Sequence, residues 1–282
     1  MIAAGVGLAL MAAAVHATWN VILKVSGDPL RTFRRATVMS AIVATVVLLP
    51  ELAILGRPRI TGGAIVLCFV SSLLETAYLV LLSLAYRRGE LSAVYPIARG
   101  SAPLMSVAIG LVLLGERLTA AQFAGVGLLL GGIAAVALSQ ASGRATAPAL
   151  LTGVSIAAFQ TVDRLGVRIT EPWFYGWLLF VLMAIELQVA LAVAGRLSKP
   201  VRLNDVPAWG RSAVIGTGMW LGYFLVLWAL SLAPLAVVAP VREVSIVAVA
   251  AWGVWRLREG RSAALKLSGA AATLVGVALL AV

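Results

Sequence analysis

The feature that most restricts this fold is a series of ten apolar runs, each about long enough to cross a bilayer as a helix. A transmembrane helix needs about 20 mainly apolar residues. The runs cover residues 2–23, 36–55, 62–86, 91–114, 120–139, 148–167, 172–194, 207–232, 235–255 and 263–282. The connectors are mostly short. Transmembrane β-strands would instead alternate polar and apolar residues over about 10 positions. The sequence therefore predicts an all-α polytopic membrane protein with ten transmembrane helices.

The charge content supports a membrane location. Charged residues make up 12% of the chain, whereas a soluble domain carries about 25%. The net charge of +11 would suggest nucleic-acid binding in a soluble protein. In a membrane protein, however, basic residues gather at the membrane faces. We therefore expect a lipid bilayer, in the inner or plasma membrane of the cell, and no nucleic acid as a partner.

Internal similarity divides the chain into two halves. An offset of 144 residues aligns Pro96 with Pro240, Gly125 with Gly269 and Gly132 with Gly276. We expect two five-helix repeats, residues 1–144 and 145–282. Because five is an odd number, the second repeat enters the membrane from the opposite side. This 5+5 inverted repeat is typical of secondary transporters whose substrate site lies near the middle of the membrane.

Three segments carry a pattern known from one family. They read His-Ala-Thr-Trp-Asn-Val-Ile-Leu-Lys (16–24), Tyr-Pro-Ile-Ala-Arg-Gly (95–100) and Leu-Gly-Glu-Arg-Leu-Thr (114–119). With them the chain resembles the EamA family of the drug/metabolite transporter (DMT) superfamily over essentially its whole length, as two EamA-like repeats. The second repeat departs from the pattern at 257–261, where it reads Leu-Arg-Glu-Gly-Arg. The resemblance implies transport of small metabolites, often export of amino acids or drugs, without ATP hydrolysis.

Two indications of membrane orientation disagree. Connectors after odd-numbered runs, counted together with Arg211 and Lys266 near the start of the runs that follow them, hold 15 of the 22 Lys and Arg residues. Connectors after even-numbered runs hold 4, and 3 lie deep inside runs. Because cytoplasmic loops are enriched in Lys and Arg, this count favours both termini outside the cytoplasm. Members of the EamA family usually place both termini in the cytoplasm.

Polar residues in the first and sixth runs are candidates for a central cavity, because ionisable groups inside a bilayer are costly unless paired or hydrated. In each run two of these residues are four positions apart and so share a helix face. The alternative is a buried hydrogen-bonded clamp between the repeats. The residues are His16, Trp19 and Asn20 in the first run, and Gln160, Asp163 and Arg164 in the sixth.

The third and eighth runs repeat another polar pair. Glu75 and Tyr78 are three residues apart, as are Trp220 and Tyr223. Aromatic rings there can hold a flat or cationic substrate group. A carboxylate in low dielectric can gain or lose a proton near neutral pH. We therefore expect Glu75 and Asp163 to be candidates for proton coupling, although a salt bridge from Glu75 to an arginine is an equal alternative.

The fourth and ninth runs each contain an internal proline, Pro96 and Pro240. Proline kinks a transmembrane helix, and the backbone carbonyls that it frees are tolerated against protein or a water-filled cavity. Polar residues beside these prolines are therefore further candidates for the substrate site, or for salt bridges to Glu75. They are Tyr95 and Arg99 in the fourth run, and Arg242 and Glu243 in the ninth.

The intramembrane cations and candidate anions are equal in number, which favours an amphoteric substrate. We therefore expect a secondary transporter, and not an enzyme, that exports amino acids or similar small molecules by alternating access. Alternatives are proton-coupled efflux of lipophilic cations, transport of organic or phosphorylated anions, and a lipid flippase. The single histidine excludes a multi-histidine metal site, and we expect no metal or cofactor. The small-residue spacing of Gly127 and Gly131 is compatible with a monomer or a weak homodimer.

Overall fold

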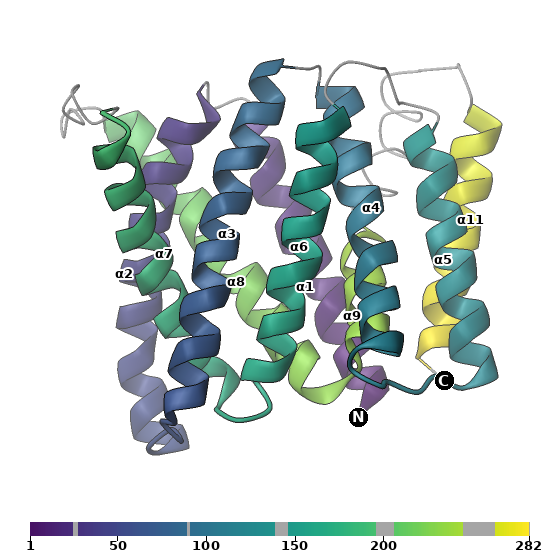
Figure 1. Ribbon diagram of the computed structural model, residues 1–282, viewed down its shortest axis with the longest axis horizontal. Coiled ribbons are helices and arrows are strands. Elements are labelled where there is room, and N and C mark those ends of the chain that lie inside the picture. The colour runs from purple at the N-terminus through teal and green to yellow at the C-terminus, as the bar shows by residue number, and fades with distance from the viewer. Residues whose placement is uncertain (25–27, 89–90, 139–145, 196–205, 245–262, 282) are drawn as a thin grey trace.

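The computed structural model describes residues 1–24, 28–88, 91–138, 146–195, 206–244 and 263–281, and in these residues every regular element is an α-helix. The helices are α1 (Ile2–Lys24), α2 (Pro29–Leu55), α3 (Gly62–Arg88), α4 (Leu91–Val112), α5 (Ala120–Leu138), α6 (Thr146–Gly166), α7 (Pro172–Val193), α8 (Val206–Leu232), α9 (Leu235–Arg242) and α11 (Ala263–Leu280) (Figure 1). Each expected run therefore contains a helix. The expected ninth run continues into residues 245–262, which lie outside the described part of the chain.

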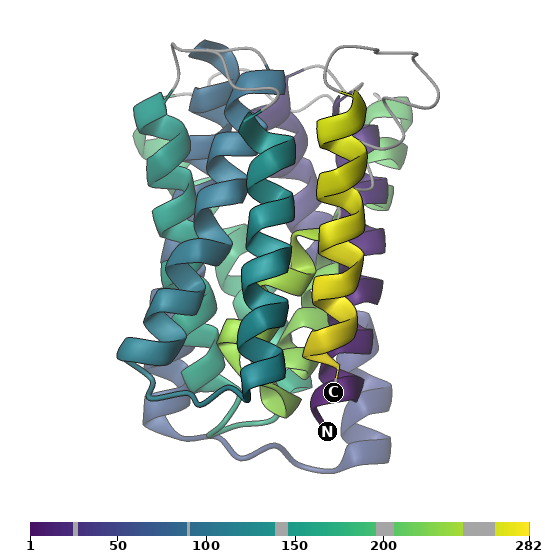
Figure 2. The same cartoon turned by 90° about the vertical axis from the view of Figure 1, so that its right-hand side faces the viewer.

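The helices form an upright bundle in which successive helices run in alternating directions (Figures 1 and 2). Both termini lie at one end of the bundle, here called the terminal end, together with the connections at 56–61, 113–119 and 167–171. As a result α1 starts at the terminal end, whereas α6 starts at the opposite end. The most extensive contacts join α5 with α11, α1 with α8, α3 with α6, and α4 with α6.

Helix α2 begins seven residues before the expected position because its start is capped. The Asp28 carboxylate accepts hydrogen bonds from the backbone N–H groups of Leu30, at 2.9 Å, and Arg31, at 3.3 Å. Pro29 occupies the first helical turn, where no backbone donor is needed. Such a cap extends the helix beyond the apolar run into residues that lie at the end of the bundle.

The outer surface of the bundle is apolar. Large apolar side chains such as Val46, Leu49 and Ile54 of α2, and Val66 and Phe69 of α3, are exposed. Among the described residues five helices are long and apolar enough to cross a membrane: α1, α2, α3, α7 and α8. Exposed apolar faces of this extent suit lipid rather than water. The protein is thus an all-helical multi-pass membrane protein.

Two pairs of glycines bring α5 and α11 into backbone contact. A Cβ atom at Gly125 would lie 2.8 Å from the Gly276 carbonyl oxygen, and a Cβ at Gly276 would lie 2.7 Å from the Gly125 carbonyl oxygen. Farther along, Gly132 faces the Gly269 carbonyl oxygen in the same way. The contact needs glycine because any side chain would push the helices apart. We call these four residues the glycine seam.

Candidate substrate-binding site

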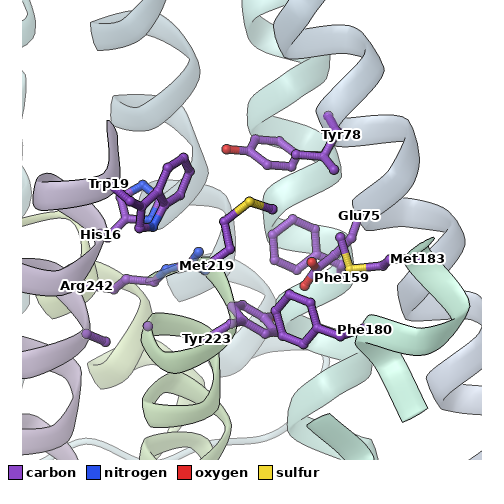
Figure 3. Close-up of a pocket in the computed structure, with 13 residues that line it drawn as sticks. His16, Trp19, Glu75, Tyr78, Phe159, Phe180, Met183, Met219, Tyr223 and Arg242 are labelled. Atoms are coloured by element: carbon purple, nitrogen blue, oxygen red, sulfur yellow. The ribbon is translucent and has the colours of Figure 1, made fainter. Parts of the chain in front are cut away.

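A small cavity lies between the helices in the middle of the bundle (Figure 3). Its volume is about 40 Å³, which is room for about three water molecules at 10–15 Å³ each. Helices α1, α3, α6, α7, α8 and α9 contribute to it. It is lined by Ala12, His16, Trp19, Glu75, Tyr78, Leu79, Phe159, Phe180, Met183, Met219, Gly222, Tyr223 and Arg242.

Two opposite charges approach this cavity from different helices. Glu75 comes from α3 and Arg242 from the end of α9, and Figure 3 shows them on opposite sides of Met219. The two residues are only 6% and 7% exposed. Within the described structure, Glu75 Oε1 and Arg242 Nη1 are buried without a hydrogen-bond partner. Because a buried charged atom without a hydrogen bond is costly, each group is suited to bind a ligand group of the opposite charge.

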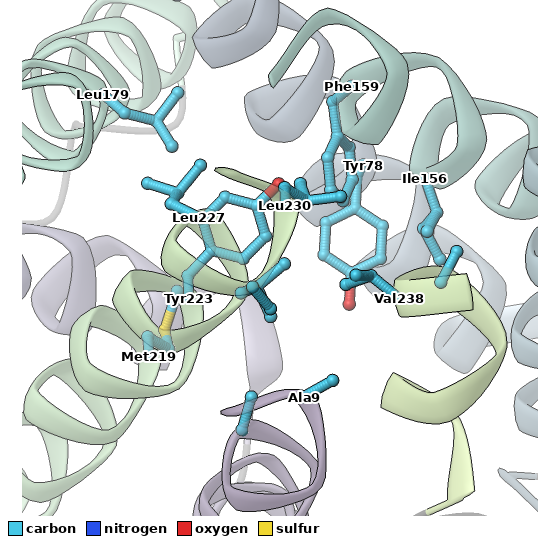
Figure 4. Close-up of a cluster of buried hydrophobic side chains, with 14 of the residues drawn as sticks. Ala9, Tyr78, Ile156, Phe159, Leu179, Met219, Tyr223, Leu227, Leu230 and Val238 are labelled. Atoms are coloured by element: carbon cyan, nitrogen blue, oxygen red, sulfur yellow. The ribbon is translucent and has the colours of Figure 1, made fainter. Parts of the chain in front are cut away.

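Aromatic rings form the walls of the cavity. The His16 and Trp19 rings meet edge-on at 4.6 Å, and the Phe159 ring lies 5.8 Å from Tyr78 and 5.9 Å from Tyr223. The Arg242 guanidinium carbon lies 5.0 Å from the centre of the Tyr223 ring, a cation–π contact that orients the arginine. Figure 4 shows Tyr78, Phe159 and Tyr223 continuing into the apolar core around Leu227 and Leu230. The charged groups are therefore held by a rigid apolar frame.

Asp163 lies behind the cavity wall and contacts the cavity through a tyrosine. It is fully buried on α6. The Tyr175 hydroxyl donates to Asp163 Oδ1 at 3.0 Å, and the Tyr223 hydroxyl donates to Oδ2. Both carboxylate oxygens therefore have a donor, and Tyr223 joins Asp163 to the cavity that Glu75 lines.

Arg164 takes part in a separate cluster near the terminal end. Its Nε donates to Glu116 Oε1 at 3.2 Å, and its Nη1 donates to the Leu230 carbonyl oxygen. Glu116 also accepts the backbone N–H groups of Leu235, at 2.7 Å, and Ala236, at 2.9 Å, and so caps the start of α9. This cluster is the clamp between helices that was the alternative to a cavity role for Arg164.

The other polar candidates whose side chains the structure describes do not line the cavity. The Asn20 amide donates to the His16 carbonyl oxygen at 2.7 Å, and Gln160 Oε1 accepts the Ser106 hydroxyl at 3.0 Å. The Trp220 ring packs against Phe224 at 5.3 Å. Glu243 is buried just after the end of α9. The side chains of Tyr95 and Arg99 lie outside the described residues.

Several residues of the site were not predicted from the sequence. Phe159, Phe180, Met183 and Met219 line the cavity, but an apolar residue in an apolar run gives no signal of such a role. Glu116 carried a signal, since it is an acidic residue inside the Leu-Gly-Glu-Arg motif at 114–117. The motif pointed to the family, but it did not predict that Glu116 contacts Arg164 and the start of α9.

A further intramembrane carboxylate connects α3 and α7. Glu186 Oε1 accepts the Ser72 hydroxyl at 2.6 Å, and Oε2 accepts the Thr76 hydroxyl at 3.0 Å. The two donors are four residues apart on α3 and share one face, so a single carboxylate can accept from both. Glu186 therefore faces α3, where the two hydroxyl groups donate the hydrogen bonds that water would otherwise supply.

Comparisons with known proteins agree with this fold. The model of the EamA-like transporter family matches residues 3–138. A search of curated proteins finds no sequence match. Among solved structures 28 chains match, including a crystal structure of a protein that is 16% identical, with a TM-score of 0.76, covering 98% of this chain and 97% of that chain. At such low identity the likeness concerns the fold alone. The family resemblance is confirmed for the first half of the chain, since residues 3–138 match the model of the EamA-like transporter family.

Proposed function

We propose that the protein is a secondary active transporter that exports amino acids or similar small amphoteric metabolites across the inner or plasma membrane. The observation that carries this proposal is that two buried, oppositely charged side chains line one cavity, each with an atom that has no hydrogen-bond partner among the described residues: Glu75 Oε1 and Arg242 Nη1. A substrate with an ammonium and a carboxylate group would neutralise both. A purely cationic or purely anionic substrate would leave one charge uncompensated.

The cavity walls suggest how the substrate is held. Its ammonium group would lie against Glu75, near the Tyr78 ring, and its carboxylate would accept hydrogen bonds from Arg242. Apolar side-chain atoms would contact Trp19, Phe180 and Met183. These contacts favour neutral amino acids with apolar side chains.

The size of the cavity supports transport by alternating access. A volume of about 40 Å³ is smaller than an amino acid, so the helices must separate to admit one. An inverted repeat of residues 1–144 and 145–282 would provide two related openings. The glycine seam supports such a repeat, because Gly125 and Gly132 align with Gly269 and Gly276 but contact them crosswise, as a two-fold axis requires.

Proton coupling through Glu75 or Asp163 would supply the driving force. The transporter would need only its substrate and the lipid bilayer, as a monomer or a weak homodimer, with no cofactor.

Efflux of lipophilic cations is a second candidate. It is favoured by the aromatic rings of Tyr78, Phe159 and Tyr223 around Glu75. In that case Arg242 would be neutralised by Glu75 whenever the cation is absent.

Flux measurements in proteoliposomes test the proposal. The probe is a pool of labelled neutral amino acids, with and without a pH gradient. Glu75→Gln and Arg242→Gln are each expected to raise KM about 10–100-fold, because each removes about 1.5–3 kcal/mol of charged hydrogen bonding. Thr45→Val on the outer face of α2 is the matched control, because the hydroxyl that it removes contacts only the Trp177 indole N–H and the Ala41 carbonyl oxygen among the described groups, away from the cavity.

Two analogues separate the candidates. Amines that lack the carboxylate and carboxylates that lack the amine should both compete poorly with amino acids. Strong competition by lipophilic amines, lost in Glu75→Gln but kept in Arg242→Gln, would favour drug efflux. No amino-acid flux through folded protein would refute the amino-acid proposal.

A further inference from the structure

A buried carboxylate behind the cavity is joined to two sides of the molecule by tyrosines. The Tyr223 hydroxyl donates to Asp163 and its ring lines the cavity. Tyr175, which donates to the other carboxylate oxygen, is fully buried in the first turn of α7, where its backbone N–H donates to the Glu171 carbonyl oxygen. The first turn of α7 lies at the terminal end of the bundle. Asp163 is thus linked to the cavity by Tyr223 and toward the terminal end by Tyr175.

The last residue of α6 makes this arrangement possible. A Cβ at Gly166 would collide with Tyr175 Cε2 and would lie 2.8 Å from the Tyr175 hydroxyl oxygen. Packed atoms do not approach this closely, so a side chain at Gly166 would displace the tyrosine ring. Glycine at this position therefore allows Tyr175 to reach Asp163.

The described groups around Asp163 contain more acid than base. Those that act on it or on its tyrosines are Cys68 and Glu75 of α3, Tyr175 of α7, Tyr223 of α8, and Arg242 of α9. Glu186 of α7 acts in turn on Cys68 and Glu75. Glu186 accepts two hydroxyl groups, and Arg164, beside Asp163 on α6, is paired with Glu116. Glu75, Asp163 and Arg242 together carry a net charge of −1 when all are ionised. Burial disfavours that state, so the two acids are suited to share one proton.

We propose that Asp163 stores the transported proton, and that Tyr175 and Tyr223 form a relay for it between the terminal end and the cavity. This inference rests on the proposed function. It assigns to Tyr175 a positioning and proton-transfer role that is separate from substrate binding.

The relay conserves protons at each step. During loading, the Tyr175 hydroxyl gives its proton to Asp163 Oδ1 while the Tyr175 oxygen takes a proton from water admitted at the terminal end. The carboxyl group then turns about its Cβ–Cγ bond. During release, it gives its proton to the Tyr223 oxygen while the Tyr223 hydroxyl proton passes to Glu75 or to water in the cavity.

Comparing two transport modes tests the relay. Substrate exchange without a pH gradient requires binding and alternating access, but no net proton movement. Accumulation driven by a pH gradient requires proton transfer. For Tyr175→Phe we expect exchange within about twofold of the unmodified protein and accumulation reduced about tenfold or more, as for loss of a proton-transfer group. Asp163→Asn and Gly166→Ala should show the same separation, and Thr45→Val should keep both modes.

Infrared spectroscopy provides a measurement that does not depend on a substrate. The unmodified protein should show a pH-dependent C=O band of a protonated carboxyl group that is absent from Asp163→Asn. Its frequency should shift in Tyr175→Phe because one hydrogen bond is lost. Accumulation unchanged in Tyr175→Phe, exchange and accumulation lost in equal proportion, or absence of an Asp163 band at every pH would overturn the relay. Absence of amino-acid flux in the unmodified protein counts instead against the proposed function, and the infrared band then decides the relay.

Discussion

At the scale of single residues, Glu116 joins α6 to the start of α9. One carboxylate accepts the Arg164 guanidinium and two backbone N–H groups of α9. Its pair with Arg164 is nearly buried, with side-chain exposures of 7% and 10%. A helix start has unsatisfied N–H groups and a partial positive charge, and a carboxylate compensates for both. Glu116 therefore fixes the start of the short helix that carries Arg242.

Glu116→Gln should lower the free energy of unfolding by about 3–5 kcal/mol, because it leaves the buried Arg164 without its counter-charge. Equilibrium unfolding in mixed micelles measures the change. The double variant Glu116→Gln with Arg164→Met should recover part of the loss, since no unpaired charge remains. A single-variant loss below about 1 kcal/mol, the range of an exposed pair, would contradict the assigned role.

At the scale of helices and their connections, close contact depends on small residues. Gly276 faces the Gly125 carbonyl oxygen and the Leu129 backbone nitrogen, which a Cβ would approach to 2.7 and 2.8 Å. Gly127, on the same helix as Gly125, has open space where a Cβ would be. The two positions therefore distinguish packing from the intrinsic helix preference of glycine.

Gly276→Ala should destabilise the protein by about 1–3 kcal/mol through overpacking. Gly127→Ala should be neutral or stabilising by about 0.5–1 kcal/mol, because alanine favours a helix more than glycine. Unfolding midpoints of both variants, measured side by side, check the difference. Equal effects of the two substitutions would show that α5 and α11 do not meet at backbone distance.

The connections at the terminal end are joined by a salt bridge near the helix ends. Arg59 Nε lies 3.0 Å from Glu171 Oε1, and the Arg59 backbone N–H donates to Oε2 at 2.6 Å. Partial burial raises the pKa of Glu171, but the hydrogen bonds from Arg59 outweigh it, so the pKa lies below its ordinary value. Ionised Glu171 therefore stabilises the folded state.

This contribution should depend on pH. Because the folded-state pKa is lowered, the stabilisation is present above the ordinary glutamate value of about 4.3 and is lost as the pH falls below it. Glu171→Gln should cost at most about 1 kcal/mol at pH 7, since Arg59 is well exposed. Thermal unfolding at pH 7 and at acidic pH checks this: the difference between the two proteins should shrink on acidification, and a constant difference would contradict it.

At the scale of the whole molecule, the bilayer explains why the helices were predictable. A segment that crosses lipid must pair its backbone N–H and C=O groups with each other, because lipid offers no hydrogen bonds. Long apolar runs therefore predict helices without knowledge of how the helices pack. Polar and aromatic residues inside the runs also predicted 6 of the 13 residues that line the cavity, including Glu75, Tyr223 and Arg242. The rest depends on partners far apart in sequence: Arg164 meets Glu116 across 48 residues and Gln160 meets Ser106 across 54. Spacing along one helix carries no information about such partners.

The glycine seam has a consequence for how this sequence can change over generations. Gly125 and Gly276 each face the carbonyl oxygen of the other, so a side chain gained at Gly125 would strike Gly276, and the reverse also holds. Neither glycine can be replaced by a larger residue while the helices keep their spacing. In a collection of natural variants, residue size at these two positions should covary. A larger residue at either position should be accompanied by a shift of α11 relative to α5.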